Sequence, residues 1–153
     1  MTEPAWLNDT EMRAWTSFLE AGDLMRRQIE LQLRESGVTQ VQYEILTRLE
    51  ERRDQKCHMT ELADAMVCSR SGLTYQVSRL EKTGLLRREN DTADERAVLV
   101  SITPAGQEVL RKAAPGHVGT VRQGFFDVLT PQQVSYFADI MDTVRRHLRE
   151  TSF

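Results

Sequence analysis

The fold of this chain is decided by residues 60–103, which read TELADAMVCSRSGLTYQVSRLEKTGLLRRENDTADERAVLVSIT. The stretch begins with a predicted helix over 60–66, in which the Thr60 hydroxyl is expected to cap the first turn. After a turn at Val67-Cys68, a second predicted helix begins with Ser69 as its N-cap. Two short helices joined by so tight a turn are typical of a helix-turn-helix.

The second helix has two faces of opposite character. Leu73, Val77 and Leu80 recur at helical spacing and form an apolar stripe that is expected to face the core. The other face carries short hydrogen-bonding side chains and cations, the types that reach base edges and phosphates in a major groove. Its members are Ser71, Thr74, Tyr75, Ser78 and Arg79, with Ser69 and Arg70 at the start of the helix. An ordinary solvated helix would have a similar polar face, so this stripe alone leaves both interpretations open.

A β-hairpin follows the second helix and favours the DNA-binding interpretation. Two short strands are predicted over 85–88 and 98–102, with a polar loop between them. We expect Arg96 in this loop to enter a minor groove and Asp94 to hold its guanidinium in position beforehand. Arg88, on the first strand, is expected to contact a phosphate.

These segments resemble the MarR family of bacterial transcriptional regulators. The ordered residues that carry the likeness are Leu62-Ala63, Ser69-Arg70-Ser71-Gly72-Leu73, the run from Arg79 to Arg88, Asp94-x-Arg96 and Leu99-x-x-x-Thr103-x-x-Gly106. The resemblance implies a dimeric winged helix-turn-helix protein, usually a repressor. It also implies that a small phenolic or aromatic-acid ligand, or an oxidant, lowers the affinity for DNA. Val67 departs from the pattern, because many helix-turn-helix sequences carry glycine there, and a different turn is expected.

The whole sequence predicts a mainly α protein with a small β-hairpin wing. Residues 1–153 are expected to form a single MarR-like domain, with a winged helix-turn-helix DNA-binding lobe at 39–103 and dimerisation helices at 8–36 and 104–150. Capping patterns begin helices at Asn8, Thr39, Thr103 and Thr130. Pro115 is expected to kink or break the helix that contains it.

The flanking helices are amphipathic and too few to bury both of their faces. This predicts a symmetric homodimer, with a monomer as the alternative. Two-fold symmetry predicts a palindromic operator in double-stranded DNA, with half-sites about ten base pairs apart.

Charge is distributed unevenly along the chain, whose net charge is −3. The stretch from Ser69 to Arg88 contains five cationic residues and one acidic residue, a net charge of +4, which leaves −7 for the remainder. A local basic patch is sufficient for phosphate contact. No targeting segment or apolar run long enough for a bilayer is evident, so we expect a cytoplasmic protein with no membrane partner.

The two cysteines have no metal-binding spacing, and a disulfide is not expected in the cytoplasm. Cys68 is expected to fill the core between the two short helices, and Cys57 to be exposed. Redox sensing by Cys57 is the alternative to an inert thiol.

A small aromatic effector is expected between the dimer-forming helices and the DNA-binding lobe, where the family resemblance implies ligand binding. The candidate residues are Trp15, Tyr43, His117 and Arg122. The alternative gives Trp15 and Tyr43 places in the core, His117 a structural hydrogen bond and Arg122 a place on the surface.

Two other classes of function were open to a helical chain of this size. An enzyme is disfavoured because the sequence has no catalytic triad order, phosphate loop or zinc spacing, and its histidines, His58, His117 and His147, are scattered. Catalytic residues, metal ligands and cofactors are therefore not expected. A protein-interaction module could keep the winged shape without binding DNA, but it would not require the exposed Ser71, Thr74, Arg79 and Arg96.

Overall fold

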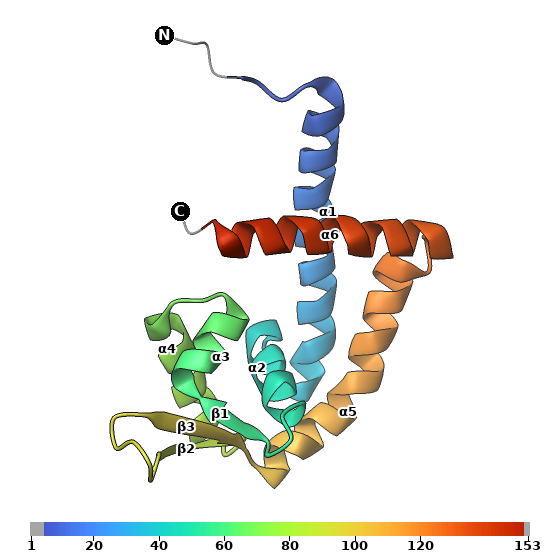
Figure 1. Cartoon of the computed structure of the whole chain (residues 1–153). Coiled ribbons are helices and arrows are strands. Elements are labelled where there is room, and N and C mark those ends of the chain that lie inside the picture. The colour runs from blue at the N-terminus through green and yellow to red at the C-terminus, as the bar shows by residue number, and fades with distance from the viewer. Residues whose placement is uncertain (1–4, 152–153) are drawn as a thin grey trace. The chain divides into compact units, whose positions relative to one another are not determined.

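The computed structural model describes residues 5–151 and consists mainly of helices with one small antiparallel sheet (Figure 1). The helices are α1 (Asp9–Leu33), α2 (Gln40–Glu50), α3 (Met59–Met66), α4 (Arg70–Lys82), α5 (Pro104–Val121) and α6 (Pro131–Glu150). The strands are β1 (Lys56–His58), β2 (Leu86–Asn90) and β3 (Val98–Ile102). A 3-10 turn over Arg34–Ser36 follows α1, and a π-helical segment over Arg122–Phe126 follows α5. The predicted fold class is confirmed.

The chain divides into two compact units, Arg26–His117 and Met1–Met25 with Val118–Phe153. Helices α1 and α5 contribute residues to both units. Among the described residues, no helix combines the length and apolar character needed to cross a membrane.

The unit Arg26–His117 contains the helix-turn-helix and a sheet with the strand order β1-β3-β2. In the two antiparallel pairs, Lys56 lies opposite Ser101 and Leu86 lies opposite Ile102. The core beneath them is aliphatic and includes Leu33, Ile45, Leu46, Leu49, Leu62, Leu73, Val77, Leu80, Leu86 and Val100. Strand β1 was not predicted, because three residues are too few to display a strand pattern.

The helix starts follow the capping patterns of the sequence at most positions. Asn8 and Glu11 exchange side-chain to backbone hydrogen bonds of 2.8 and 2.9 Å, and the Thr39 and Thr130 capping boxes are both formed. The Ser69 hydroxyl accepts from the amide of Gly72 at 3.1 Å. The prediction for Thr60 is wrong: α3 begins one residue earlier with His58 at its N-cap, so Thr60 lies inside the helix.

Thr103 links the sheet to α5. Its hydroxyl donates to the carbonyl of Gly84 at 2.6 Å and accepts from the amide of Gly106 at 3.1 Å. A Cβ at Gly106 would lie 2.2 Å from the Leu85 carbonyl oxygen, so only glycine fits where α5 begins. Gly106, the last residue of the motif that resembles the MarR family, is therefore required by its close packing against the Leu85 carbonyl.

A kink or a break was expected at Pro115; the break is wrong, and the kink stays a prediction. Helix α5 is continuous over Pro104–Val121, and its irregular segment comes later, at Arg122–Phe126. Proline removes one intrahelical hydrogen bond. The buried Leu110 and Ala113, just before Pro115, anchor the helix to the core and hold it across that missing bond.

The turn between α3 and α4 also differs from expectation. Val67 adopts the left-handed conformation, with φ 52° and ψ 44°, and its amide donates to the Asp64 carbonyl at 3.3 Å. The turn therefore keeps the backbone conformation that glycine would favour. A β-branched residue is strained at this φ. The strain at Val67 lowers the free energy of unfolding by about 1–2 kcal/mol relative to a residue in an unstrained conformation.

The two cysteines have exchanged the environments predicted for them. Cys57 is only 4% exposed, because it is the central residue of β1 and faces the core. Cys68 is exposed, because it lies in the turn just before the cap of α4. Burial raises the pKa of the Cys57 thiol, which opposes the redox alternative.

Candidate nucleic-acid interface

Helix α4 presents its polar face to solvent because its apolar stripe is buried in the core. Leu73, Val77 and Leu80 are buried as predicted. The predicted DNA-contacting residues of α4 are exposed, except for Ser78, which is half-buried; the exposed ones are Ser69, Arg70, Ser71, Thr74, Tyr75 and Arg79. The interior packing thus orients this set towards solvent.

Hydrogen bonds within α4 limit what its side chains can offer a partner. The Thr74 hydroxyl donates to the Arg70 carbonyl at 2.8 Å, so its oxygen lone pairs and methyl group are what it presents outward. The Arg79 guanidinium lies 5.9 Å from the centre of the Tyr75 ring, a cation–π contact that pre-positions both side chains.

The hairpin loop is held by hydrogen bonds of two aspartates, Asp91 and Asp94, to backbone groups of the loop. The Asp91 amide donates to the Ala97 carbonyl at 2.9 Å, and the Ala97 amide donates to the Asp94 carbonyl at 2.9 Å. Asp94 Oδ1 accepts from the backbone amide of Arg96 at 3.0 Å. The prediction that Asp94 holds the Arg96 guanidinium is therefore wrong: Asp94 holds the backbone of Arg96. That guanidinium has no carboxylate partner within residues 5–151, and its side chain is exposed.

Arg88 joins the hairpin to α4. Its backbone amide donates to Glu81 Oε2 at 3.1 Å, and its Nη2 and Nε donate to Glu81 Oε1 at 2.9 and 3.3 Å. The side-chain hydrogen bond from Arg88 is the main reason that the pKa of Glu81 lies below its usual value. Arg88 is thus engaged by a carboxylate, a structural role that the sequence analysis did not assign to it.

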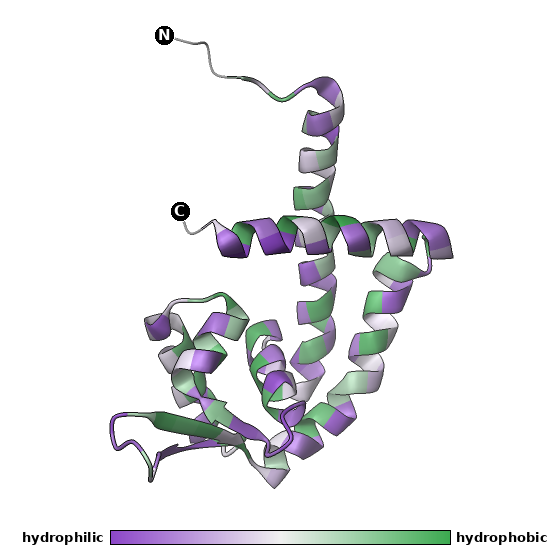
Figure 2. Ribbon diagram, viewed as in Figure 1, coloured by the Kyte–Doolittle hydropathy of each residue, from purple (hydrophilic) through white to green (hydrophobic). Residues whose placement is uncertain are grey.

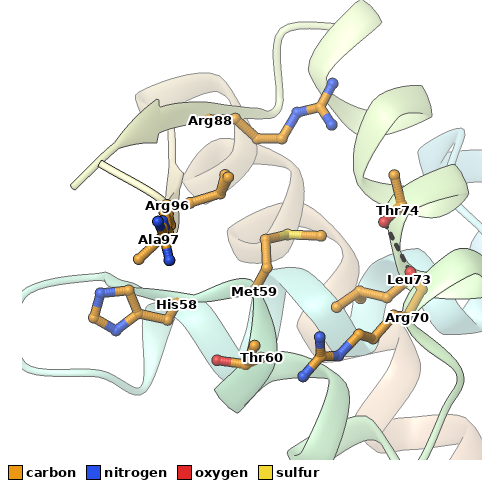
Figure 3. Close-up of a pocket in the computed structure, with 10 residues that line it drawn as sticks. His58, Met59, Thr60, Arg70, Leu73, Thr74, Arg88, Arg96 and Ala97 are labelled. Carbon is orange, nitrogen blue, oxygen red and sulfur yellow. Dashed lines mark hydrogen bonds between the residues drawn. The ribbon is translucent and has the colours of Figure 1, made fainter. Parts of the chain in front are cut away.

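A hollow of about 300 Å³ lies between α4 and the hairpin. Figure 3 shows Arg70 and Thr74 of α4, Arg88 of β2 and Arg96 of the loop arranged around it. The structure therefore brings together residues that the sequence predicted separately. It also adds His58 at the end of β1, which the sequence analysis missed because nothing local marks that position.

A second depression, of about 490 Å³, extends the basic surface towards the start of α2. Tyr75 and Arg79 line it together with Arg34 and Thr39. Gln42 of α2 donates to Gln76 of α4 at 3.3 Å and links the two helices. Arg34 is a further cation that the sequence analysis did not include in the interface.

Comparison with known proteins identifies the family. The model of the MarR family matches residues 38–98. The crystal structure of AbsC, a MarR family transcriptional regulator from Streptomyces coelicolor, is 38% identical in sequence. The similarity covers 96% of this chain and 99% of AbsC, with a TM-score of 0.92. The chain belongs to the MarR family.

Two further relatives agree with this assignment. Sco3205, a MarR family regulator from Streptomyces coelicolor whose structure was determined in complex with DNA, is 41% identical to this MarR-family chain. The match covers 97% of the chain and 93% of Sco3205, with a TM-score of 0.92. An uncharacterized HTH-type transcriptional regulator of Bacillus cereus (strain ZK / E33L) is 27% identical over 115 residues, 75% of each protein. The resemblance is confirmed, and the family consists of transcriptional regulators rather than enzymes.

In this MarR-family chain, the residues predicted to bind an effector fall into two pairs. Tyr43 and His117 are in contact, with ring centroids 4.5 Å apart. Tyr43 is 9% exposed, and burial lowers the pKa of His117. Within the described residues, the buried Nδ1 of His117 has no hydrogen-bond partner, so the structural hydrogen bond considered as an alternative is not formed by that atom.

Trp15 and Arg122 belong to the other unit. Trp15 is 53% exposed and stacks on Phe18 with ring centroids 5.9 Å apart, so the alternative that placed Trp15 in the core is wrong for this chain. Arg122 forms an exposed ion pair with Asp127 at 3.5 Å.

Proposed function

We propose that this chain is a homodimeric transcriptional repressor that binds a palindromic operator in double-stranded DNA. Helix α4 would enter the major groove and the loop of the β2–β3 hairpin the adjacent minor groove. The observation that carries this proposal is the hollow whose walls bear Arg70, Thr74 and Arg96 from two separate elements. A solvated helix would not need an arginine-tipped loop beside its polar face.

The electrostatics of this surface support DNA as the partner. Arg70, Arg79, Lys82 and Arg87 are all exposed, although the chain as a whole carries a net charge of −3. Concentrated positive charge attracts phosphates and releases counterions, so binding should weaken strongly as salt rises. Arg88, already paired with Glu81, would add less to this salt dependence than the unpaired Arg96.

The second unit supports the homodimer. None of the described residues of α6 is buried, although the helix is amphipathic (Figure 2). Large apolar side chains of this unit remain exposed, including Trp15, Phe18, Leu19, Tyr136, Ile140, Val144 and Leu148. A second copy of the chain would cover them through a two-fold interface. We therefore assign 8–36 and 104–150 to dimerisation and 39–103 to DNA binding.

An aromatic effector is supported by Tyr43 and His117. The unpartnered Nδ1 of His117 beside the Tyr43 ring offers a hydrogen-bonding position next to an aromatic surface. For Trp15 and Arg122 we also propose the ligand-binding role that was predicted from the sequence. Binding of a small phenolic compound beside Tyr43 and His117 would release the operator.

Fluorescence anisotropy with the full-length chain tests the proposed function. The probes are a labelled duplex from the DNA upstream of its own gene and a random-sequence duplex of the same length, each at two salt concentrations. We expect tighter binding to the upstream duplex and a steep loss of affinity with salt. Equal, weak binding to both duplexes at both salt concentrations would favour the protein-interaction module instead.

A further inference from the structure

A histidine and an aspartate connect the outer strands of the sheet at the end where the hairpin loop begins. His58 Nε2 lies 2.7 Å from Asp91 Oδ2. His58 is the last residue of β1, and Asp91 directly follows β2. Since β3 lies between these strands, they share no backbone hydrogen bonds, and the side-chain contact spans the central strand.

Asp91 divides its hydrogen bonds between the loop and His58. Its Oδ1 accepts from the Ala93 amide at 2.9 Å, and its own amide donates to Ala97 at 2.9 Å. Its Oδ2 is left for His58. Arg96 adjoins Ala97, so the base of the loop that carries Arg96 is held through Asp91. In Figure 3 His58 lies near Ala97 and Arg96, at the edge of the hollow.

The charges around His58 make this contact sensitive to protonation. Asp91 is the carboxylate that it contacts, and the cations around the same hollow are Arg70, Arg88 and Arg96. Lys56 lies on β1 itself and acts on Asp91. The pKa of Asp91 is lowered first by the Ala93 amide and then by His58, so this carboxylate stays ionised at neutral pH. A protonated His58 converts a neutral hydrogen bond into a charge-assisted one.

We propose that His58 is a positioning residue for DNA binding: it holds Asp91, and through Asp91 the loop that presents Arg96. Protonation of His58 tightens this hold, so the contribution of the loop to DNA affinity rises as pH falls. The inference rests on the proposed function, because it assigns the loop to DNA.

Two substitutions separate the hydrogen bond from the charge. His58→Gln keeps a neutral donor for Asp91 but cannot titrate, and His58→Ala removes both. We measure affinity of the full-length proteins for a duplex selected by the wild-type chain from a random pool, between about pH 5.5 and pH 8. We expect His58→Ala to weaken binding about three- to tenfold at the acid end, and His58→Gln to flatten the pH profile.

The matched control is His147→Gln on the exposed surface of α6. It removes a histidine outside the DNA-contacting surface; because α6 is assigned to dimerisation, the variant is first shown by sedimentation to have the same oligomeric state as wild type, and its pH profile should then match that of wild type. A profile that is unchanged in His58→Gln, or lost equally in His147→Gln, overturns the inference.

A double-mutant cycle with Arg96→Ala tests whether His58 acts through the loop. If it does, His58→Gln should have little further effect on affinity once Arg96 is absent. Fully additive losses of affinity would mean that His58 affects DNA binding independently of Arg96, and the positioning role would be refuted.

Amide hydrogen exchange in the free protein tests the hold on the loop without DNA. We expect His58→Ala to accelerate exchange at the Arg96 and Ala97 amides, both of which are hydrogen-bonded within the loop. Unchanged exchange at those two amides refutes the role of His58. A wild-type chain that binds no duplex specifically would instead refute the proposed function, while the exchange experiment would still decide whether His58 holds the loop.

Discussion

Replacement of Arg96 by alanine isolates the contribution of the hairpin loop to DNA binding. The Arg96 side chain is exposed, and its guanidinium has no carboxylate partner in the described part of the chain. Its removal should therefore leave the free energy of unfolding within about 0.5 kcal/mol of wild type. The loss should appear almost entirely in the complex, because that is where the guanidinium gains partners.

The expected loss for Arg96→Ala is about 1–3 kcal/mol per subunit, or roughly 5- to 150-fold in affinity for each half-site. A dimer carries two copies, so the loss for a full operator should be about twice as large in free energy. Fluorescence anisotropy against the selected duplex measures the affinity, and thermal unfolding measures the stability.

Two variants distinguish the role of Arg96 from a general effect of charge. Arg96→Lys keeps the charge but not the planar guanidinium, so it should preserve the salt dependence while losing part of the affinity. Arg52→Ala removes an exposed arginine that pairs with Glu61 at 3.5 Å, outside the interface, and should leave affinity nearly unchanged. Equal losses in Arg96→Ala and Arg52→Ala would refute the groove contact, and so would no loss in Arg96→Ala.

Three further predictions concern the turn, the cysteines and the link between α4 and the hairpin. Val67→Asn should raise the stability by about 0.5–1 kcal/mol in thermal unfolding, because asparagine tolerates the left-handed conformation and the valine side chain is 79% exposed; a loss of stability would contradict the strain at this turn. A thiol reagent should modify Cys68 in the native protein and Cys57 only on unfolding, as mass spectrometry would reveal; rapid native labelling of Cys57 would argue against its burial. Because the pKa of Glu81 is lowered in the folded state, its stabilising effect is present at neutral pH and is lost as the pH falls below its ordinary value of 4.5. Glu81→Gln should therefore reduce stability at neutral pH and make it less sensitive to acid, and an acid-unfolding curve identical to that of wild type would exclude this role.

Much of the fold could be predicted from the sequence because the deciding interactions are local. The capping boxes at Thr39 and Thr130 join residues three positions apart, so both partners are visible in a short motif. The apolar stripe of α4 likewise follows from helical spacing alone. These patterns placed most of the helices correctly, and the ordered residues from Leu62 to Gly106 indicated the family.

The wrong predictions concern residues whose environment is decided by a segment that is distant in the sequence. β1 forms because β3, more than 40 positions later, supplies its hydrogen bonds, and that pairing is what buries Cys57. Helix α5 stays continuous because Leu110 and Ala113, which precede Pro115, pack into the core, and the sequence around Pro115 does not show this packing. Asp94 was correctly placed in the loop, but its partner is a backbone amide rather than the Arg96 guanidinium, a choice that depends on the exact path of the loop.

Spacing along the chain was enough to determine most of the helices and most of their caps, the polar face of α4 and an arginine in the following loop. Tertiary structure alone decided that Glu81 engages Arg88 and that His58 meets Asp91 across the sheet. The physical reason is that a cap or an amphipathic stripe is formed within one or two helical turns. A contact between outer strands instead depends on the register of a third strand that lies between them.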